Sequence, residues 1–259
     1  MKAIQYRSPR GLSNLSIVQT EDPGGPCCGR DPGQHTCVFF EPYDYNLALG
    51  VLPVENGRIM MSDGASIIEA IGTEVAGFAI GDRVVSTFFP DWQQGDAQLA
   101  TFARTPGDDL DGYGVEMVVR PANWFTHVPR DWSLAEAATL PTASLTAWRA
   151  LVVEGQLRAG QDVLVLGTGG VSVFALQLAK QMGARVIVTS SSDEKLERAR
   201  GLGADFFVNF RRHENWSATV LELTKGRGVD LVVETSGPGT LPQSIQATRI
   251  GGASYSSAS

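Results

Sequence analysis

Residues 163–172 read Val-Leu-Val-Leu-Gly-Thr-Gly-Gly-Val-Ser, and this stretch decides the fold. The four apolar residues form a short continuous run that ends at glycine, which is typical of a buried strand in a parallel sheet. Beyond Gly170 the apolar residues recur at helical spacing, at Val171, Phe174, Ala175, Leu178 and Met182. Gly183 follows them and indicates the helix C-terminus. The stretch therefore predicts a strand, a glycine-rich turn and a helix in direct succession.

The same alternation continues after the helix. Further strands are predicted over residues 185–189, 206–210 and 229–234, and further helices over residues 191–201, 215–224 and 240–248. Ser191 and Glu194 are spaced as a capping box, in which each side chain bonds a backbone amide of the other residue. Alternating strands and helices predict β-α-β units, right-handed crossovers and a parallel sheet. The fold class is therefore α/β.

The glycine-rich turn points to phosphate binding. Gly167 allows a tight turn, and Gly169 lets backbone amides approach a pyrophosphate at the N-terminus of a helix, which carries a partial positive charge. Glycines also end strands for conformational reasons alone. Here the strand, turn and helix stand in the order that dinucleotide binding needs, although Ser172 replaces the third glycine of the usual fingerprint. We expect nucleotide contacts from Gly167, Thr168, Gly169, Gly170 and Val171.

The end of the next strand indicates which dinucleotide binds. An NAD site usually has an acidic residue there, about 20 residues after the glycines, to bind the ribose hydroxyls. This chain instead has Ser190, Ser191 and Ser192, followed by Lys195. These groups could cradle a 2′-phosphate, although the serines could equally be helix caps and the lysine a solvated side chain. We expect NADP(H) in preference to NAD(H), with Ser190, Ser191 and Lys195 as contacts.

Composition excludes several classes of protein. The chain has 259 residues, 43% hydrophobic and 19% charged, which suits about two globular domains. With 21 basic against 28 acidic residues, its net charge of −7 argues against a nucleic-acid partner. No apolar run is long enough to span a membrane, and three cysteines indicate a reducing, cytoplasmic setting. The partner that we expect is a small-molecule substrate.

Several motifs in combination resemble the medium-chain dehydrogenase/reductase superfamily, in its zinc-independent quinone-reductase-like and alcohol-dehydrogenase-like branch. The matching stretches are residues 68–72 (Ile-Glu-Ala-Ile-Gly), 81–84 (Gly-Asp-Arg-Val), 136–148 and 163–239. The resemblance implies a GroES-like β-rich domain over residues 1–130, a Rossmann domain over residues 131–259, and a cleft in which hydride passes between nicotinamide and substrate. It also implies that Thr146 lies beside the nicotinamide, and it is compatible with a homodimer.

The resemblance bears on zinc as well. The three residues that hold catalytic zinc in zinc-dependent relatives align with Glu41, Ser62 and Thr142, and the glutamate of their Gly-His-Glu motif aligns with Asp63. Catalytic zinc needs three good protein ligands and an open position. This set offers one carboxylate at most, so we expect no zinc.

Without a metal, hydrogen bonds must polarise the substrate oxygen, and a proton must come from a side chain or water. The candidates for this chemistry are Asp44, Tyr45 and Asp63, with Ser62 beside them. Tyr45 could equally be a packing aromatic with its hydroxyl at the rim. We interpret His127 as a surface or interdomain residue. The aromatic group Phe88, Phe89 and Trp92 is either a substrate wall or ordinary packing.

Two regions disagree with the expected fold. Residues 24–42 lack a strand pattern where relatives have a core strand, and we interpret this segment as aberrant. Its cysteines and histidine, which are Cys27, Cys28, His35 and Cys37, fit no common zinc signature. From residue 253 the chain is polar and small, so we expect the parallel sheet to be truncated after its fourth strand.

Two functions remain open. The leading interpretation is an NAD(P)H-dependent oxidoreductase that acts on a carbonyl, enone or quinone. The alternative is a non-catalytic dinucleotide-binding protein, which the expected loss of later strands favours. A third class, a pure interaction protein, would not bind NADPH at all. The identity of the substrate would rest on analogy alone.

Overall fold

The computed structural model describes residues 1–22, 37–102 and 104–256, which fall into two compact units, Met1–Thr142 and Ala143–Ser259. The boundary lies later than the expected position after residue 130. The reason is that α2 (Leu134–Ala137) belongs to the first unit, where Leu134 and Ala137 pack against Ala65 and Val85. Each unit is described by itself below.

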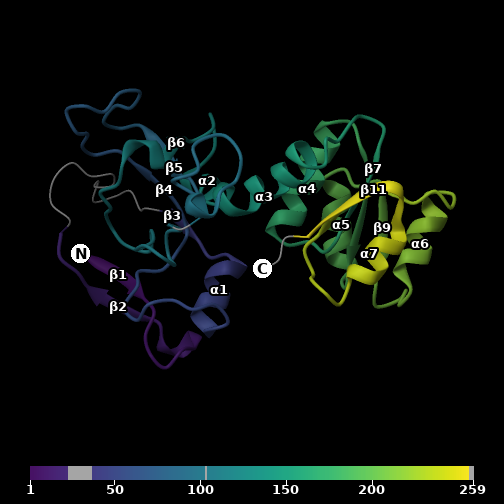
Figure 1. The fold of residues 1–259 in the computed structure, drawn as a ribbon, viewed down its shortest axis with the longest axis horizontal. Helices are drawn as coiled ribbons and strands as arrows, with labels where there is room; N and C mark the ends of the chain where they lie inside the picture. Colours follow the sequence, from purple (N-terminus) through teal and green to yellow (C-terminus); the bar gives the residue numbers. More distant parts are fainter. Residues whose placement is uncertain (23–36, 103, 257–259) are drawn as a thin grey trace. The chain divides into compact units, whose positions relative to one another are not determined.

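The first unit is β-rich (Figure 1). Its main sheet has the order β3-β4-β5-β6 and is antiparallel throughout. The strands are β3 (Cys37–Phe39), β4 (Asp63–Ile67), β5 (Arg83–Ser86) and β6 (Phe125–His127). A separate antiparallel pair joins β1 (Lys2–Gln5) to β2 (Ser16–Gln19). One helix, α1 (Pro42–Leu49), follows β3 directly and begins with proline at its first position, where proline is favoured.

The strand β3 corrects part of the expectation for residues 24–42. Residues 24–36, with Cys27, Cys28 and His35, lie outside the described residues. Cys37–Phe39, however, pairs with β4 in register Val38 to Gly64. Cys37 and Phe39 pack in one hydrophobic cluster and Val38 in another, so these three residues do alternate between two faces. The expectation that no strand forms there is wrong for this short piece, because three residues are too few for a pattern to stand out.

The second unit is a five-stranded parallel sheet in the order β11-β10-β7-β8-β9. The strands are β7 (Asp162–Val165), β8 (Arg185–Ser190), β9 (Phe206–Asn209), β10 (Val229–Glu234) and β11 (Thr248–Ser256). The helices are α3 (Leu145–Trp148), α4 (Gly170–Gln181), α5 (Asp193–Gly201), α6 (Trp216–Leu223) and α7 (Leu241–Ala247). The α/β class and the parallel sheet predicted from the alternating pattern are therefore confirmed.

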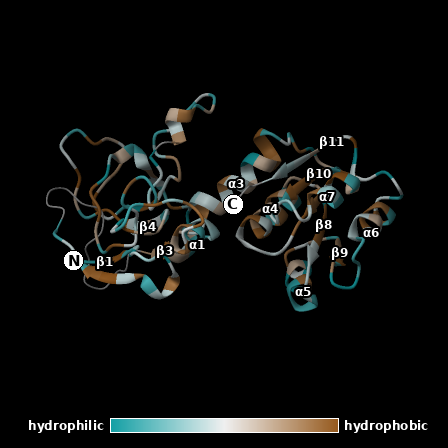
Figure 2. Ribbon diagram, turned by 60° about the horizontal axis from the view of Figure 1, so that its bottom comes forward, coloured by the Kyte–Doolittle hydropathy of each residue, from teal (hydrophilic) through white to brown (hydrophobic). Residues whose placement is uncertain are grey.

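Two hydrophobic cores cover the two faces of this sheet. Helices α4 and α5 contribute alanines and leucines to one core, against Val163, Val186 and Leu231. Helices α6 and α7 contribute Trp216, Val220 and Ala247 to the other. Figure 2 shows the result, with brown, apolar strands inside and more hydrophilic segments on the surrounding helices. Such a doubly covered sheet explains why its strands read as continuous apolar runs.

The strand β11 corrects the expected truncation after strand four. It runs parallel to β10, with Ala253 opposite Leu231 and Tyr255 opposite Val233. Ala253 and Tyr255 pack against the core that α4 and α5 cover. Small polar residues can form this strand because its position is fixed by backbone pairing to β10. In a strand at the edge of a sheet, only every second residue needs to be apolar.

The start of α5 differs by one residue from the prediction. Ser192, and not Ser191, is the N-cap, and its hydroxyl accepts a hydrogen bond from the Lys195 amide. The first turn carries Asp193 and Glu194, which favour the positive end of the helix. Ser191 therefore does not cap the helix.

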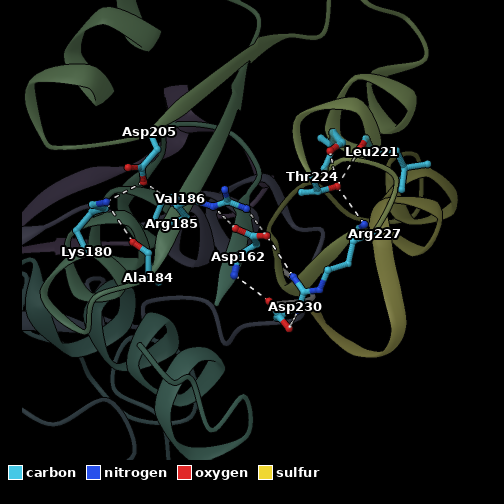
Figure 3. A network of polar contacts seen from close by, with 12 residues as sticks. Asp162, Lys180, Ala184, Arg185, Val186, Asp205, Leu221, Thr224, Arg227 and Asp230 are labelled. Carbon is cyan, nitrogen blue, oxygen red and sulfur yellow. Dashed lines mark hydrogen bonds and ion pairs between the residues drawn. The ribbon is translucent and has the colours of Figure 1, made fainter. Parts of the chain in front are cut away.

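An ion-pair network lies at the amino-terminal edge of the parallel sheet (Figure 3). Asp162 begins β7 and receives two hydrogen bonds, of 2.6 and 2.7 Å, from Arg185 at the start of β8. Asp230 of β10 accepts the Asp162 amide at 2.9 Å and pairs with Arg227. This edge is the opposite end of the strands from the glycine-rich turn.

Among the helices of the described residues, none combines the length and apolar character that crossing a membrane requires.

Candidate functional site

The glycine-rich turn joins β7 to α4. Gly167 has φ of 74°, in the left-handed region that favours glycine. Gly169 is the N-cap of α4 and supplies no side-chain cap, and the Val173 amide makes a helical bond to its carbonyl. The amides that precede Val173 in α4 therefore have no acceptor within the helix. An uncapped helix N-terminus of this kind is suited to an anion, because its N–H groups and dipole both favour negative charge.

Three hydroxyl groups brace this turn. Ser172 and Thr235 both donate to the Leu166 carbonyl, at 2.6 and 2.8 Å. Thr189 accepts the Gly167 amide at 3.2 Å. Ser172 therefore does more than fill the position of the third fingerprint glycine: it ties the first turn of α4 to the end of β7. A braced turn presents its free amides without reorganising when a ligand arrives.

The loop after β10 is held by a buried glutamate. The Glu234 carboxylate accepts the amides of Ser236 and Gly237, at 2.7 and 3.2 Å, and the hydroxyls of Thr240 and Ser244. The side chain is fully buried. Since Thr235 from the same segment touches both Leu166 and Ser172, this loop and the glycine-rich turn form one connected edge. Sequence reasoning missed Glu234 because a glutamate at a strand end carries no distinctive pattern.

A hollow of about 250 Å³ lies beside the turn. Gly167, Thr168 and Ser172 line it from one side, and Lys195 and Arg198 of α5 line it from the other. Within the described part of the chain the Lys195 ammonium has no ion-pair partner, whereas Arg198 pairs with the exposed Glu194 at 2.7 Å. Arg198 was not predicted. Its spacing of three residues from Lys195, on one helical face, is the signal that could have found it.

Three other predicted nucleotide contacts, Ser190, Ser191 and Thr146, are not among the residues that line this hollow. Ser190 is buried at the end of β8, and its hydroxyl accepts the Ser192 amide at 3.3 Å. Ser191 is half-buried in the turn that follows. Thr146 lies in α3 and is half-buried. The structure thus brings Gly167, Thr168 and Lys195 to one hollow.

The first unit contains a group of buried carboxyls around the start of α1 and the start of β4. Asp44 is fully buried and accepts the amides of Glu41 and Ser62, both at 3.1 Å, on its two oxygens. Burial raises the pKa of Asp44 to about 6, although hydrogen bonds from backbone amides act to lower it. Its position and hydrogen bonds make Asp44 a brace between two segments of the first unit.

Asp63 is buried as well, at the first position of β4. Its two oxygens receive the Thr142 hydroxyl at 2.7 Å and the Thr142 amide at 3.0 Å. Burial raises the pKa of Asp63 well above its usual range, against the hydrogen bonds from Thr142. Two residues earlier, Met61 has φ of 73°, a left-handed conformation that costs a non-glycine residue of order 1 kcal/mol. Asp44 and Asp63 are therefore brought together, each with both oxygens engaged.

The remaining candidates of the first unit lie elsewhere. Tyr45 is 41% exposed, and its ring meets Phe40 edge to face. His127 ends β6 at the surface, with its Nε2 atom 3.1 Å from the Gly77 carbonyl oxygen. Phe89 and Trp92 pack against each other and against Phe102, and Phe88 meets Phe89 edge to face, as an aromatic cluster does in ordinary packing.

The residues that align with the zinc ligands of zinc-dependent relatives do not suit that metal. Thr142 donates its hydroxyl to Asp63, and Ser62 supplies only a neutral hydroxyl, so Glu41 is the single anionic ligand of the three. No group of three histidine, cysteine or acidic side chains that could hold a metal ion occurs within residues 1–22, 37–102 and 104–256. The donor set falls short of the three good ligands that catalytic zinc requires.

Comparison with known proteins places these sites in context. Residues 170–258 match the family described as zinc-binding dehydrogenase. The chain is 45% identical over 196 residues to a zinc-type alcohol dehydrogenase-like protein of Schizosaccharomyces pombe, and it spans 57% of the length of that relative.

Two solved structures show the same fold. One, described as an alcohol dehydrogenase of Sinorhizobium meliloti, is 39% identical with a TM-score of 0.85, and the match covers 99% of this chain and 76% of that one. A quinone oxidoreductase of Pseudomonas syringae is 28% identical with a TM-score of 0.76, covering 96% and 70% of the two chains. The resemblance to the medium-chain dehydrogenase/reductase superfamily noted from the sequence motifs is confirmed.

Proposed function

This chain belongs to the medium-chain dehydrogenase/reductase superfamily of oxidoreductases, and from that premise we propose that it is a zinc-independent, NADP(H)-dependent reductase of carbonyl, enone or quinone compounds. The nicotinamide cofactor, when bound, supplies the hydride. The protein binds its diphosphate, orients it and excludes water. A cytoplasmic setting is part of the same proposal, because that is where a reducing NADPH pool is available to a chain with few cysteines.

The observation that carries the proposal is the uncapped start of α4. The amides ahead of Val173 are free of helical acceptors, the turn before them is braced by Ser172 and Thr235, and the space over Gly169 is open. These features suit the diphosphate of a dinucleotide better than a neutral ligand. The donor set at Glu41, Ser62 and Thr142 supports independence from zinc.

Binding and turnover separate this function from the alternative, a dinucleotide-binding protein without catalysis. We expect NADPH to quench the intrinsic protein fluorescence with a micromolar Kd. We also expect NADPH to be oxidised in the presence of at least one member of a panel of benzaldehyde, 2-cyclohexen-1-one and 1,4-benzoquinone, and prior dialysis against a zinc chelator should leave the rate unchanged. Binding without turnover on any of these compounds would select the alternative, and loss of the rate on chelation would refute zinc independence.

The preference for NADPH should depend on α5. Lys195 and Arg198 line the hollow beside the turn, and each can pair with a 2′-phosphate that NADH lacks. We expect Lys195→Ala to raise the Kd of NADPH about 10-fold and the double variant with Arg198→Ala about 100-fold, with the Kd of NADH changing less than threefold. Glu197→Gln, on the same helix, is the matched control. Equal losses for both nucleotides would place the phosphate elsewhere.

A further inference from the structure

Several buried side-chain atoms of the first unit have no hydrogen-bond partner within the described residues, and two of them belong to residues whose backbone amides Asp44 binds. Glu41 is 3% exposed and Ser62 is 0% exposed. Within residues 1–22, 37–102 and 104–256, the Oε1 atom of Glu41 and the Oγ atom of Ser62 have no hydrogen-bond partner. Native proteins rarely leave buried polar atoms unpaired, because the lost hydration is not replaced. Groups of this kind are candidates for binding a polar atom of a ligand.

A single side chain holds these two groups together. The Asp44 carboxylate accepts the Glu41 amide on one oxygen and the Ser62 amide on the other, each at 3.1 Å. Glu41 immediately precedes α1, and Ser62 immediately precedes β4. Residues from two distant parts of the sequence are thereby fixed against one buried carboxylate, which is the kind of rigid support that a catalytic pair needs.

The other carboxyls of this group are committed to the protein. Both oxygens of Asp44 receive backbone amides, and both oxygens of Asp63 receive donors from Thr142. Glu41, in contrast, has one oxygen, Oε1, that no donor reaches in the part of the chain that the structure describes. The group therefore contains two carboxyls that position the backbone and one that can act on a ligand.

We propose, on the basis of the proposed function, that the Glu41 carboxyl and the Ser62 hydroxyl bind the oxygen of an aldehyde or ketone substrate, and that Glu41 is its proton donor. The carbonyl carbon would accept the hydride that NADPH supplies when it is bound. As the carbon–oxygen π bond breaks, its electron pair takes the proton from Glu41 and forms the hydroxyl of the product. The carbonyl is reduced, the nicotinamide is oxidised, and the Glu41 carboxylate regains a proton from water. Ser62 stabilises the developing negative charge on the oxygen.

The charges around Glu41 support this role. Burial, followed by the charge of Asp44, raises the pKa of Glu41 to about 7. Among the described residues, Asp44 and Asp63 are the titratable groups that face it, and burial raises the pKa of each. Glu41 therefore keeps its proton below about pH 7 and loses it as the pH rises. Reduction should be fast at pH 6 and should fall tenfold per pH unit above the Glu41 pKa.

The test compares Glu41→Gln, Glu41→Asp and Ser62→Ala with the wild-type protein, and uses the exposed Glu74→Gln as the matched control. We expect Glu41→Gln to lower kcat for benzaldehyde reduction 100-fold to 1000-fold and to abolish the alkaline limb of the pH profile. Ser62→Ala should lower kcat about 10-fold. Glu41→Asp should retain the alkaline limb, because it keeps a carboxyl. The Kd of NADPH should stay within twofold in every variant.

Outcomes differ according to which idea is wrong. Wild-type protein that does not bind NADPH, or binds it and reduces no panel compound, refutes the proposed function and this inference with it. Wild-type protein that reduces benzaldehyde, with Glu41→Gln matching its rate and pH profile, overturns this inference alone. If Glu41→Gln does not fold, as judged by NADPH binding, the other two variants provide the test. A Ser62→Ala variant with the wild-type kcat would overturn this inference. A Glu41→Asp variant that loses the alkaline limb of the pH profile would overturn it as well.

Discussion

Replacing Gly169 by aspartate is expected to abolish NADPH binding while leaving the fold at least as stable as before. Gly169 is the N-cap of α4 and has extended backbone angles, φ of −80° and ψ of −176°, that any residue adopts. A Cβ atom at this position meets no heavy atom within 4 Å. Aspartate is a favoured N-cap, because its carboxylate accepts the free amides of the first helical turn. Those are the amides that a diphosphate would need, and the added negative charge repels it.

The two effects have opposite signs and can be measured separately. We expect the Kd of NADPH to rise at least 100-fold in a fluorescence titration. The free energy of unfolding should increase by about 0.5 kcal/mol in urea denaturation, from the cap and the helix dipole together. Gly169→Asn provides the control, since it caps the helix without a charge and should weaken binding less. An aspartate variant that binds NADPH within threefold of wild type would show that the diphosphate lies elsewhere.

The turn around Gly167 could be predicted because local chemistry alone fixes it. An apolar run, three glycines within four residues and a helical apolar pattern leave few other structures, so the strand, turn and helix appear where the residues place them. The strand β11 could not be read in the same way. Residues 253–256 have a weak pattern, and the neighbouring β10 supplies most of what makes them a strand. Pairing with a distant segment overrides local preference here.

The carboxyls of the first unit show a similar limit. Asp44, Tyr45 and Asp63 were candidates for proton transfer because their residue types suit that chemistry. Which side chain has a free oxygen depends on partners far along the chain, such as Thr142 for Asp63. Residue type therefore located the region, whereas only the hydrogen bonds distinguish Glu41 from its neighbours. Arg198 illustrates the same point for charge: its spacing indicates that it shares a helical face with Lys195, but only the folded hollow shows that both lie beside the glycine-rich turn.

Removal of the Asp230 carboxylate is expected to cause the largest loss of stability of any change considered. Asp230 has a side chain that is 4% exposed and accepts hydrogen bonds from Arg227, from Arg249 at 2.6 Å and from the Asp162 amide at 2.9 Å. In Asp230→Ala the two guanidinium groups lose this anion, and a buried amide loses its acceptor. Breaking a buried pair by removing one partner typically costs 3–5 kcal/mol. Because both arginines are partly exposed to water, we expect about 3 kcal/mol in urea denaturation.

The pH dependence of this contribution follows from the pKa of Asp230. Burial acts to raise that pKa, but hydrogen bonds from Arg227, the Asp162 amide and Arg249 hold it below its ordinary value of 3.8. A carboxyl whose pKa is lower in the folded state stabilises the fold fully above its unfolded pKa, and this contribution is lost as the pH falls through the folded pKa. The difference in unfolding free energy between wild type and Asp230→Ala should therefore be constant from about pH 5 to 8. It should shrink below about pH 4.

Glu197→Ala is the matched control for this prediction, because Glu197 forms an exposed ion pair with Arg200 on α5. Exposed pairs are worth little, so its loss should cost less than 0.5 kcal/mol. NADPH affinity, measured below the unfolding transition, should be within twofold of wild type in both variants, since the Asp230 network lies at the opposite strand ends from Gly167. If Asp230→Ala costs no more than Glu197→Ala, the three hydrogen bonds to Asp230 do not stabilise the fold, and their burial merely offsets their attraction.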